Sequence, residues 1–214
     1  MLISFISDTH THTPDVNKMV EGRDIIIHAG DISYRGTTKE VENALDWFSN
    51  LDFKHKILVP GNHDFLFEVD FNKALTMCQS RGITVLIDSM IEVEGIKIWG
   101  SPITPWFHNW AFNRFRGSSI QAHWDKIPEG IDILVTHGPP AYIGSLCETQ
   151  EGEDVGCQDL YNAIRRVKPK YCVFGHIHEG YGMREFDGIK YINASYLNRA
   201  YKPTNLPIEI DYAE

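Results

Sequence analysis

Short apolar runs alternate with amphipathic segments along most of the chain. An apolar run of four to eight residues between turn residues is typical of a buried strand. Such runs predict strands over residues 2–7, 25–28, 56–59, 83–87, 131–135 and 171–174. The Glu94-Gly95 turn predicts a hairpin between 91–93 and 96–99. Shorter strands are expected over 182–186, 190–193 and 208–211.

Apolar residues spaced three and four positions apart predict helices between these strands. Positions 41, 44, 45 and 48 form one such stripe, and Thr37 with Glu40 has the sequence of a capping box. Similar stripes predict helices around 71–78 and 160–167, and Ser118 begins a shorter one. Mixed strands and helices in this order predict an α/β fold. We expect a four-layer αββα sandwich of two mixed β-sheets flanked by helices.

The composition fits one folded, acidic domain over residues 1–214. The chain is 43% hydrophobic and 23% charged, which allows a sizeable core. Its 20 Lys and Arg against 29 Asp and Glu give a formal net charge of −9. This charge disfavours a grip on long nucleic acid or on an acidic membrane surface. Ten histidines are many for this length, and they raise the question of a metal site.

The cysteines and the N-terminus bear on the compartment. Cys78, Cys147, Cys157 and Cys172 form no C-x-x-C pair, so a reducing, cytoplasmic location is expected. The first apolar run stops at Asp8 and has no basic residues before it, which predicts a strand rather than a signal peptide. No stretch approaches 18 apolar residues, so we expect no membrane span. The oligomeric state stays open.

Polar side chains follow five of the predicted strands. They are Asp8 and His10, Asp31, Asn62 with His63 and Asp64, His137, and His176 with His178. Ligand sites form at the carboxyl ends of strands in α/β sheets, so we expect these side chains to meet. Imidazole, carboxylate and amide ligands without thiolates suit Mn²⁺, Fe²⁺ or Zn²⁺ in a site that is not structural zinc. A carboxylate that bridges two such cations favours in-line displacement at phosphorus.

Five motifs resemble the signature of the calcineurin-like metallophosphoesterases, in the same order. They are Asp8-x-His10, Gly30-Asp31, Gly61-Asn62-His63-Asp64, Thr136-His137-Gly138 and Gly175-His176-x-His178. Segments 100–107, 110–113, 132–140 and 175–182 further resemble the MPPED subgroup of metallophosphodiesterases. The resemblance implies a two-sheet sandwich and hydrolysis of small phosphodiesters, with cyclic nucleotides as candidate substrates.

The resemblance also implies a role for each motif residue. Asp8, His10, Asp31 and His178 would hold one cation, and Asp31, Asn62, His137 and His176 the other. Mn²⁺ is the expected metal, with iron and zinc as alternatives. A hydroxide that bridges the metals would attack phosphorus in line. His63 would protonate the leaving oxygen as general acid, with Asp64 near it.

The motif around Asp31 differs from that of the phosphoprotein phosphatases. Phosphoprotein phosphatases of this superfamily carry G-D-x-x-D-R-G, whereas this chain has Gly30-Asp31-Ile-Ser-Tyr34-Arg35-Gly36. The second aspartate, which would pair with the catalytic histidine, is replaced by Tyr34. The phosphoprotein phosphatase interpretation therefore loses support. Arg35 stays a candidate contact for a phosphate.

Two long irregular stretches, 101–117 and 138–156, are expected to be functional. The first is rich in aromatic residues, and Trp106, His108 and Asn109 are candidate substrate contacts. The alternative is that its rings anchor the loop to the core or form a subunit contact. The acidic run 148–154 is predicted to be a solvated loop.

The expected partner is a small phosphodiester or a nucleotide, and two functions compete. The first is a dinuclear metal hydrolase, within which a nuclease or a phosphomonoesterase is the other contender. The second is a nucleotide-binding metalloprotein with low turnover. No predicted metal position is degraded, which favours catalysis.

Overall fold

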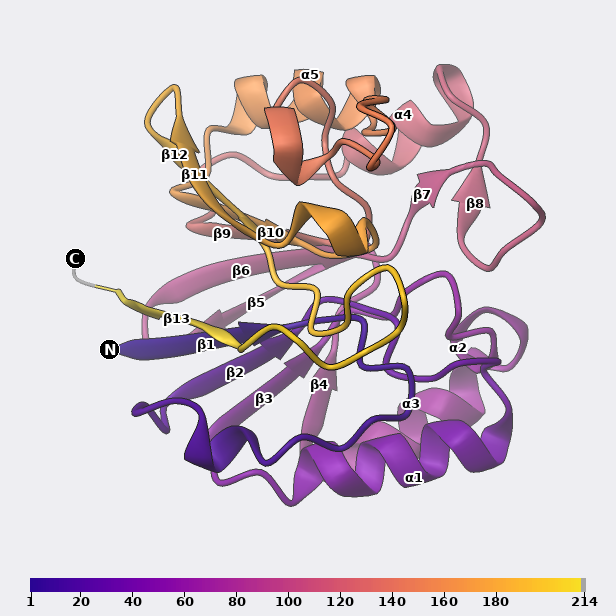
Figure 1. Ribbon diagram of the computed structural model, residues 1–214, viewed down its shortest axis with the longest axis vertical. Coiled ribbons are helices and arrows are strands. Elements are labelled where there is room, and N and C mark those ends of the chain that lie inside the picture. Colours follow the sequence, from indigo (N-terminus) through magenta and orange to yellow (C-terminus); the bar gives the residue numbers. More distant parts are fainter. Residues whose placement is uncertain (213–214) are drawn as a thin grey trace.

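Two β-sheets packed face to face form the centre of the computed structural model, which describes residues 1–212 (Figure 1). The first sheet has the strand order β13-β1-β2-β3-β4. Its strands are β1 (Leu2–Ile6), β2 (Ile25–His28), β3 (His55–Leu58), β4 (Ile83–Val85) and β13 (Ile208–Asp211). β1 to β4 run parallel, and β13 pairs antiparallel with β1 at the edge.

The second sheet has the order β11-β12-β10-β9-β6-β5. Its strands are β5 (Ser89–Val93), β6 (Ile96–Ser101), β9 (Ile133–Thr136), β10 (Tyr171–Phe174), β11 (Gly182–Phe186) and β12 (Ile189–Asn193). The four central strands are parallel, and β5 and β11 form antiparallel edges. A separate pair, β7 (Thr104–Pro105) and β8 (Asn113–Arg114), lies within the long aromatic loop.

Helices cover the outer face of each sheet (Figure 1). On the first sheet they are α1 (Thr38–Ser49), α2 (Leu66–Val69) and α3 (Phe71–Gln79), and on the second α4 (Ser118–Trp124) and α5 (Gln158–Val167). Three short 3₁₀ turns cover Val16–Lys18 (η1), Gly144–Leu146 (η2) and His178–Gly180 (η3). The predicted fold class, two mixed sheets flanked by helices, is confirmed.

Strand alternation divides the core into layers. Ile3 and Phe5 of β1 belong to the same buried cluster as Val135 of β9 and Val173 of β10, between the two sheets. Alternate residues such as Ile26 point the other way and pack with the helix layer, where the stripe of α1 is buried. Because successive side chains of a strand point to opposite faces, each buried strand contributes residues both to the core between the sheets and to the core under the helices.

The capping box at α1 is only half formed. Thr37 Oγ1 accepts a hydrogen bond from the Glu40 amide at 3.3 Å, as predicted. The Glu40 carboxylate instead accepts from the Arg35 amide at 2.7 Å, which fixes the loop before the helix. α2, β7 and β8 were not predicted, because elements of two to four residues carry no readable period.

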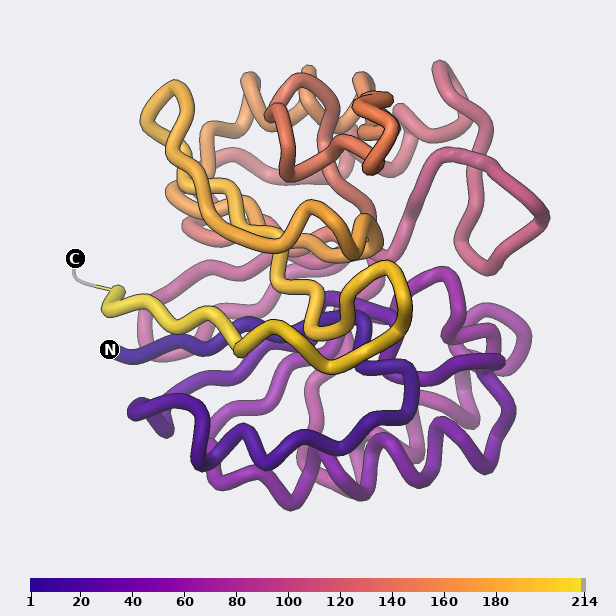
Figure 2. Tube along the Cα trace, in the orientation of Figure 1, coloured from indigo at the N-terminus to yellow at the C-terminus, as the bar shows by residue number. Residues whose placement is uncertain are grey.

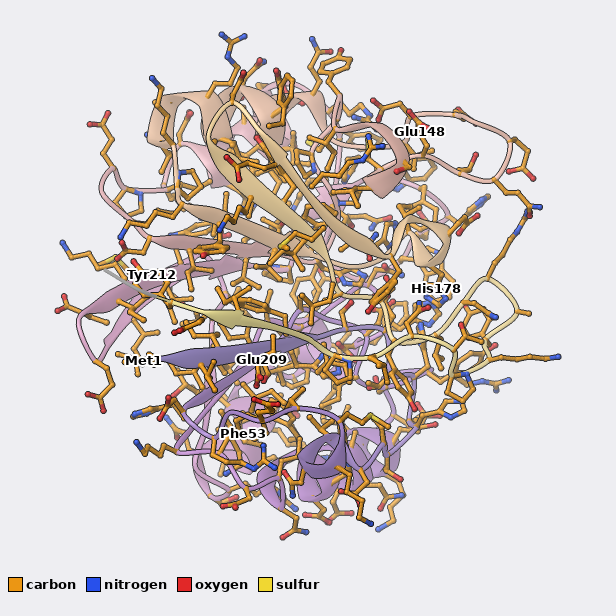
Figure 3. The ribbon with its side chains drawn as sticks, turned by 60° about the vertical axis from the view of Figure 1, so that its left-hand side comes forward. Met1, Phe53, Glu148, His178, Glu209 and Tyr212 are labelled. Atoms are coloured by element: carbon orange, nitrogen blue, oxygen red, sulfur yellow. The ribbon has the colours of Figure 1, made fainter. Side chains whose placement is uncertain are left out.

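The chain builds the first sheet, then the second, and returns to the first with β13 (Figure 2). The N-terminal ammonium of Met1 donates to Asp211 Oδ1 at 3.1 Å and to the Tyr212 carbonyl at 3.2 Å. Met1 and Tyr212 therefore lie together, at the end of the molecule away from His178 (Figure 3). The carboxyl ends of the parallel strands face the other way, toward His178.

Within residues 1–212, no helix combines the length and the apolar character that a membrane crossing requires. The four cysteines are buried free thiols. Burial raises the pKa of the Cys78 thiol to about 12, so this thiol stays protonated and unreactive at neutral pH.

Phe48→Ala should destabilise the fold strongly. The Phe48 ring is fully buried between α1 and the first sheet, so its removal leaves a cavity that costs about 3–5 kcal/mol. Urea unfolding followed by circular dichroism measures this loss. Phe71→Ala, at a ring that is 41% exposed, is the control and should lose far less. Equal losses in both variants would contradict the layer assignment.

Candidate metal centre

Loops at the carboxyl ends of five parallel strands meet at one place. Asp8, Asp31 and Asn62 follow β1, β2 and β3 of the first sheet, and His137 and His176 follow β9 and β10 of the second. The two sheets are joined here, since the His176 amide donates to the Asp8 carboxylate at 3.0 Å. The structure thus brings the predicted strand-end residues together, and the site lies between the sheets.

The backbone at these positions is unusual. Asp8, His10, Asp31 and His176 have φ values of 52°, 42°, 56° and 69°. Non-glycine residues rarely adopt this left-handed region, and such strain is found mainly at functional sites. Backbone hydrogen bonds hold it: the Asp8 amide donates to the Gly30 carbonyl at 2.9 Å and the His10 amide to the Asp31 carbonyl at 3.0 Å.

Two glycines allow these loops to approach closely. A Cβ at Gly61 would collide with the Asp31 carboxylate, and one at Gly175 would collide with Asp8. Any side chain at either position would push a predicted ligand out of place.

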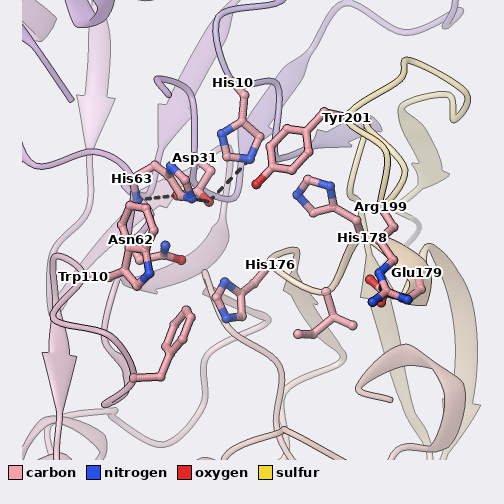
Figure 4. A pocket seen from close by; sticks show the side chains of 12 residues that line it. His10, Asp31, Asn62, His63, Trp110, His176, His178, Glu179, Arg199 and Tyr201 are labelled. Atoms are coloured by element: carbon pink, nitrogen blue, oxygen red, sulfur yellow. Dashed lines mark hydrogen bonds and ion pairs between the residues drawn. The ribbon is translucent and has the colours of Figure 1, made fainter. Parts of the chain in front are cut away.

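The predicted ligands form two groups of donor atoms. Asp8, His10 and His178 make one, and Asp31, His137 and His176 the other, with the atoms of each group within 4.8 Å of one another. Asp31 Oδ2 lies between the groups, 3.7 Å from His10 Nε2 (Figure 4). It is 3.3 Å from His137 Nε2. The Asn62 side-chain oxygen is 2.8 Å from His137 Nε2 and so joins the second group.

Three of the histidines are held in the tautomer that suits a metal ligand. The Nδ1 atoms of His10, His137 and His178 each lie near a backbone carbonyl. These carbonyls belong to Ser33, Ala29 and Asn198, at 3.2, 3.0 and 3.0 Å. A carbonyl only accepts, so each Nδ1 carries a proton and each Nε2 faces the centre, where it can offer a lone pair to a cation once the ring is neutral.

One buried nitrogen of the centre makes no hydrogen bond within the described residues. His10 Nε2 is buried and makes no hydrogen bond to any described residue. An unsatisfied buried polar atom costs about 1–3 kcal/mol, which a cation at this point would offset. The lone pair of this nitrogen suits a divalent cation, and so does the carboxylate and imidazole chemistry of the two groups.

The carboxylates of Asp8 and Asp31 are ionised. Burial alone would raise the pKa of Asp8, but the hydrogen bond and charge of His178 outweigh it, and the pKa lies well below the usual value. Burial is likewise outweighed at Asp31, whose pKa is lowered mainly by His137. Both side chains therefore offer full negative charge to a cation.

The histidines divide into two classes. Burial lowers the pKa of His10 to about 4 and that of His176 to about 3, so both are neutral. Burial is overcome at His137 by Asp31 and at His178 by Asp8, and both pKa values are raised to about 9. In the protein alone, each carboxylate is thus paired with one protonated imidazole.

Serine hydroxyls orient Asp8. Ser7 Oγ donates to Asp8 Oδ2 at 2.5 Å and Ser195 Oγ at 3.0 Å. Ser195 follows β12 and is also 2.8 Å from the Asn193 side-chain oxygen. Ser195, at the end of a predicted strand, therefore supports a ligand rather than binding a metal itself.

His63 is fixed beside this centre. Its Nδ1 donates to the Tyr34 carbonyl at 2.6 Å, and its ring lies 4.2 Å from the Trp110 ring. Its Nε2 is 4.0 Å from Asp31 Oδ2 and faces the cavity. A backbone carbonyl thus does the orienting work of the aspartate that Tyr34 replaces.

Asp64, which the sequence places near His63, is buried beneath the loops of the centre. None of the hydrogen bonds to its carboxylate comes from the His63 ring. It accepts from the amides of Gly61, Ile32 and Ser33 and from Ser33 Oγ, at 2.7–3.3 Å. Burial, together with the charge of Asp31, raises its pKa to about 6. Asp64 therefore ties two ligand loops together and does not line the cavity.

A cavity of about 340 Å³ opens above the centre. Six predicted site residues line it: His10, Asp31, Asn62, His63, His176 and His178. Six further residues complete its wall: Phe107, Trp110, Ile177, Glu179, Arg199 and Tyr201 (Figure 4). Two rings of the aromatic loop, those of Phe107 and Trp110, thus lie in the wall of this cavity.

The four predicted substrate contacts do not line this cavity. Arg35 is exposed, and His108 and Asn109 occupy an exposed loop tip with φ values of 49° and 53°. Trp106 lies beside this loop tip and stacks on the Phe115 ring at 5.6 Å. The sequence gives the composition of a long loop, but it does not tell which of the side chains point into a cavity.

Sequence reasoning missed Arg199 and Tyr201. Both lie in the loop that follows β12, a parallel strand whose carboxyl end points to the same edge. The Tyr201 ring is 5.0 Å from His10 and 5.1 Å from His178. The strand-end rule, applied to residues 194–207 as well, would have found this loop.

Comparisons with known proteins agree with this geometry. The model of the family described as calcineurin-like phosphoesterase matches residues 1–180. Metallophosphoesterase domain-containing protein 1 of Homo sapiens is 38% identical, over 96% of this chain and 69% of that protein. A UPF0046 protein of Caenorhabditis elegans is 34% identical, over 96% of this chain and 58% of that protein.

Solved structures share the fold. Phosphopantetheinyl hydrolase from Mycobacterium tuberculosis superposes with a TM-score of 0.64 at 18% identity, covering 99% of this chain and 98% of that one. TT1561 of Thermus thermophilus gives 0.62 at 14% identity, covering 98% of each. From its match over residues 1–180 and its 38% identity to a curated relative, this chain belongs to the calcineurin-like phosphoesterase family and is a metal-dependent phosphoesterase.

Proposed function

We propose that the protein is a phosphodiesterase that works with two divalent cations, Mn²⁺ before iron or zinc, on small phosphodiesters such as cyclic nucleotides. The observation that carries this proposal is the position of Asp31 Oδ2 between two groups of donors. Asp8, His10 and His178 would hold one cation with Asp31, and Asn62, His137 and His176 the other. The chemistry supplied by two bound cations is Lewis-acid polarisation of the phosphoryl oxygens and a lowered pKa of the attacking water.

His63 supports the role of general acid. Its Nδ1 proton is committed to the Tyr34 carbonyl, so only Nε2 can exchange a proton with a substrate. The ring is held against Trp110, and Nε2 faces the cavity. A protonated His63 is placed to give its Nε2 proton to the leaving oxygen.

The charge of the cavity favours a diester over a monoester. Among the twelve lining residues, Arg199 is the one Lys or Arg. Its guanidinium is held by Gln150 at 2.6 Å, by Glu151 at 3.1 Å and by Glu179 at 3.9 Å. The cavity therefore offers no free Lys or Arg side chain for the second negative charge of a monoester, whereas a diester carries one charge only.

Asp31→Asn should remove most of the bound metal and nearly all turnover. The substitution takes away the one carboxylate that lies between both donor groups, so we expect a loss of at least about 100-fold in kcat/KM. Elemental analysis of the purified variant gives the metal content. Asp46→Asn, at an exposed position on α1, is the control and should keep both. A variant that retains two metal equivalents would contradict the bridging position.

His63→Ala should leave metal content intact and slow turnover. The loss should reach about 10²–10⁴-fold for diesters with alkoxide leaving groups, and be much smaller for 4-nitrophenyl esters, which need no proton. Steady-state assays with both ester types measure the difference. His12→Ala, an exposed turn position, is the control. Equal losses for both types would argue against the acid role, and a parent rate no better than Mn²⁺ alone would favour a nucleotide-binding protein.

Metal affinity should rise with pH. The pKa values of His137 and His178 are raised to about 9, after burial is overcome by Asp31 and Asp8, and only neutral imidazole binds a cation. Below pH 9 each cation must displace one proton, so its affinity falls as pH falls by up to about 10-fold per unit, and the product of the two binding constants falls by up to about 100-fold per unit. Calorimetric titration of Mn²⁺ into the metal-free protein at about pH 6 and about pH 7 tests this.

His178→Gln has no proton to lose at this position. The product of its two Mn²⁺ binding constants should therefore change by only about 10-fold per pH unit. His55→Gln, at a half-exposed ring beside Glu94, should keep the parent slope. An affinity for Mn²⁺ that does not change with pH would contradict the assignment of these two rings as ligands.

A further inference from the structure

A second cavity of about 310 Å³ adjoins the metal cavity. The two have Phe107, His176 and Ile177 as common wall residues. We call the second cavity the side pocket; Trp106 and Pro139 belong to its wall as well. Neither His63 nor Trp110 lines it, so it extends from the side of the centre away from the general acid.

Trp106 is set in place in the absence of any ligand. One face of its indole stacks on Phe115, with ring planes 26° apart, and its N–H donates to Asn109 Oδ1 at 3.3 Å. The loop beneath is fixed by Asn113, which accepts from the Phe107 amide and donates to Thr104 Oγ1, both at 2.9 Å. A ring that is already ordered loses little conformational entropy when it binds a ligand.

The charged groups of the side pocket do not attract an anion. Arg116 lies in its wall, but its guanidinium donates to the carbonyls of Gly156 and Val155 at 2.9 and 3.3 Å. Glu153 and Asp154 also line it, and together they outnumber the single cation. A second phosphate or a carboxylate is therefore disfavoured here, whereas an uncharged group is accepted.

We propose that the side pocket binds the ester group that stays on phosphorus, and that it selects an uncharged, planar aromatic group for stacking on Trp106. This inference rests on the proposed phosphodiesterase function. The position of the side pocket relative to His63 assigns the retained group to it, since the leaving group departs past His63. In this role Trp106 is a specificity residue, and Asn109 is a positioning residue that holds the indole.

Product binding tests the proposal without any turnover. Hydrolysis of a 4-nitrophenyl diester breaks the bond from phosphorus to nitrophenol and leaves the retained group as its phosphate monoester. Calorimetry with the Mn²⁺-loaded protein compares naphthyl phosphate with methyl phosphate. Stacking on Trp106 should make the naphthyl ester bind about 5- to 100-fold more tightly. Trp106→Ala should bring this ratio close to one, and Trp106→Phe should restore part of it.

Matched variants guard against a merely structural effect. Asn109→Ala should lower the ratio by loosening the indole, and Phe186→Ala, at an exposed ring on β11, should keep the parent ratio. Glu153→Gln should improve binding of 4-carboxyphenyl phosphate relative to phenyl phosphate, because it removes a repelling charge. Metal content and thermal unfolding of each variant report whether it is folded.

Kinetics separates the side pocket from the proposed function. In 4-nitrophenyl diesters with a methyl or a naphthyl second ester, the leaving group is constant and only the retained group varies. We expect the same preference in kcat/KM as in binding. Tighter naphthyl binding without hydrolysis of either diester would overturn the phosphodiesterase but uphold the side pocket. Hydrolysis of both with a ratio near one, or a ratio unchanged by Trp106→Ala, would overturn the side pocket alone.

Discussion

The carboxylate of Asp31 lies where the edges of the two sheets meet, and the site is built around it. It is buried and ionised, so it requires positive charge nearby. The protein alone meets this need with His137, whose pKa rises to about 9 in response. Asp8 and His178 repeat the arrangement on the other side. A pair of buried carboxylates among several imidazoles is costly without cations, which is why the same arrangement serves as a cation site.

The rest of the site keeps these charges at fixed distances. Asp64 ties the loop after β2 to the loop after β3, and Ser7 and Ser195 orient Asp8. Three of the predicted ligand histidines are held through Nδ1 by backbone carbonyls, so their orientation depends on the fold rather than on other side chains. His63 follows the same rule through the Tyr34 carbonyl. The geometry is therefore set before any cation binds, as a site of this chemistry requires.

The acidic net charge and a phosphate substrate are compatible because the site differs from the surface. In the proposed dinuclear centre, two cations would exceed the charge of Asp8 and Asp31, so the cavity would become positive inside a chain of net charge −9. Around the cavity, Arg199 is held by Glu151 and Glu179. The overall negative charge therefore disfavours a long polyanionic substrate, which would have to cross a repelling surface, but it does not disfavour a small phosphate ester.

The sequence by itself determined the sheet-and-helix order and which strand-end side chains meet. Apolar runs of fixed period decide strands and helices, and the residues that follow parallel strands must meet at one edge, so Asp8, Asp31 and His137 were predictable. Which side chains face the cavity was decided only by tertiary structure. Trp106 turned into the side pocket, Asp64 turned under the loops, and Tyr201 came from a loop with no readable period. Loop side chains take their direction from long-range packing and hydrogen bonds, and local sequence carries no record of those contacts.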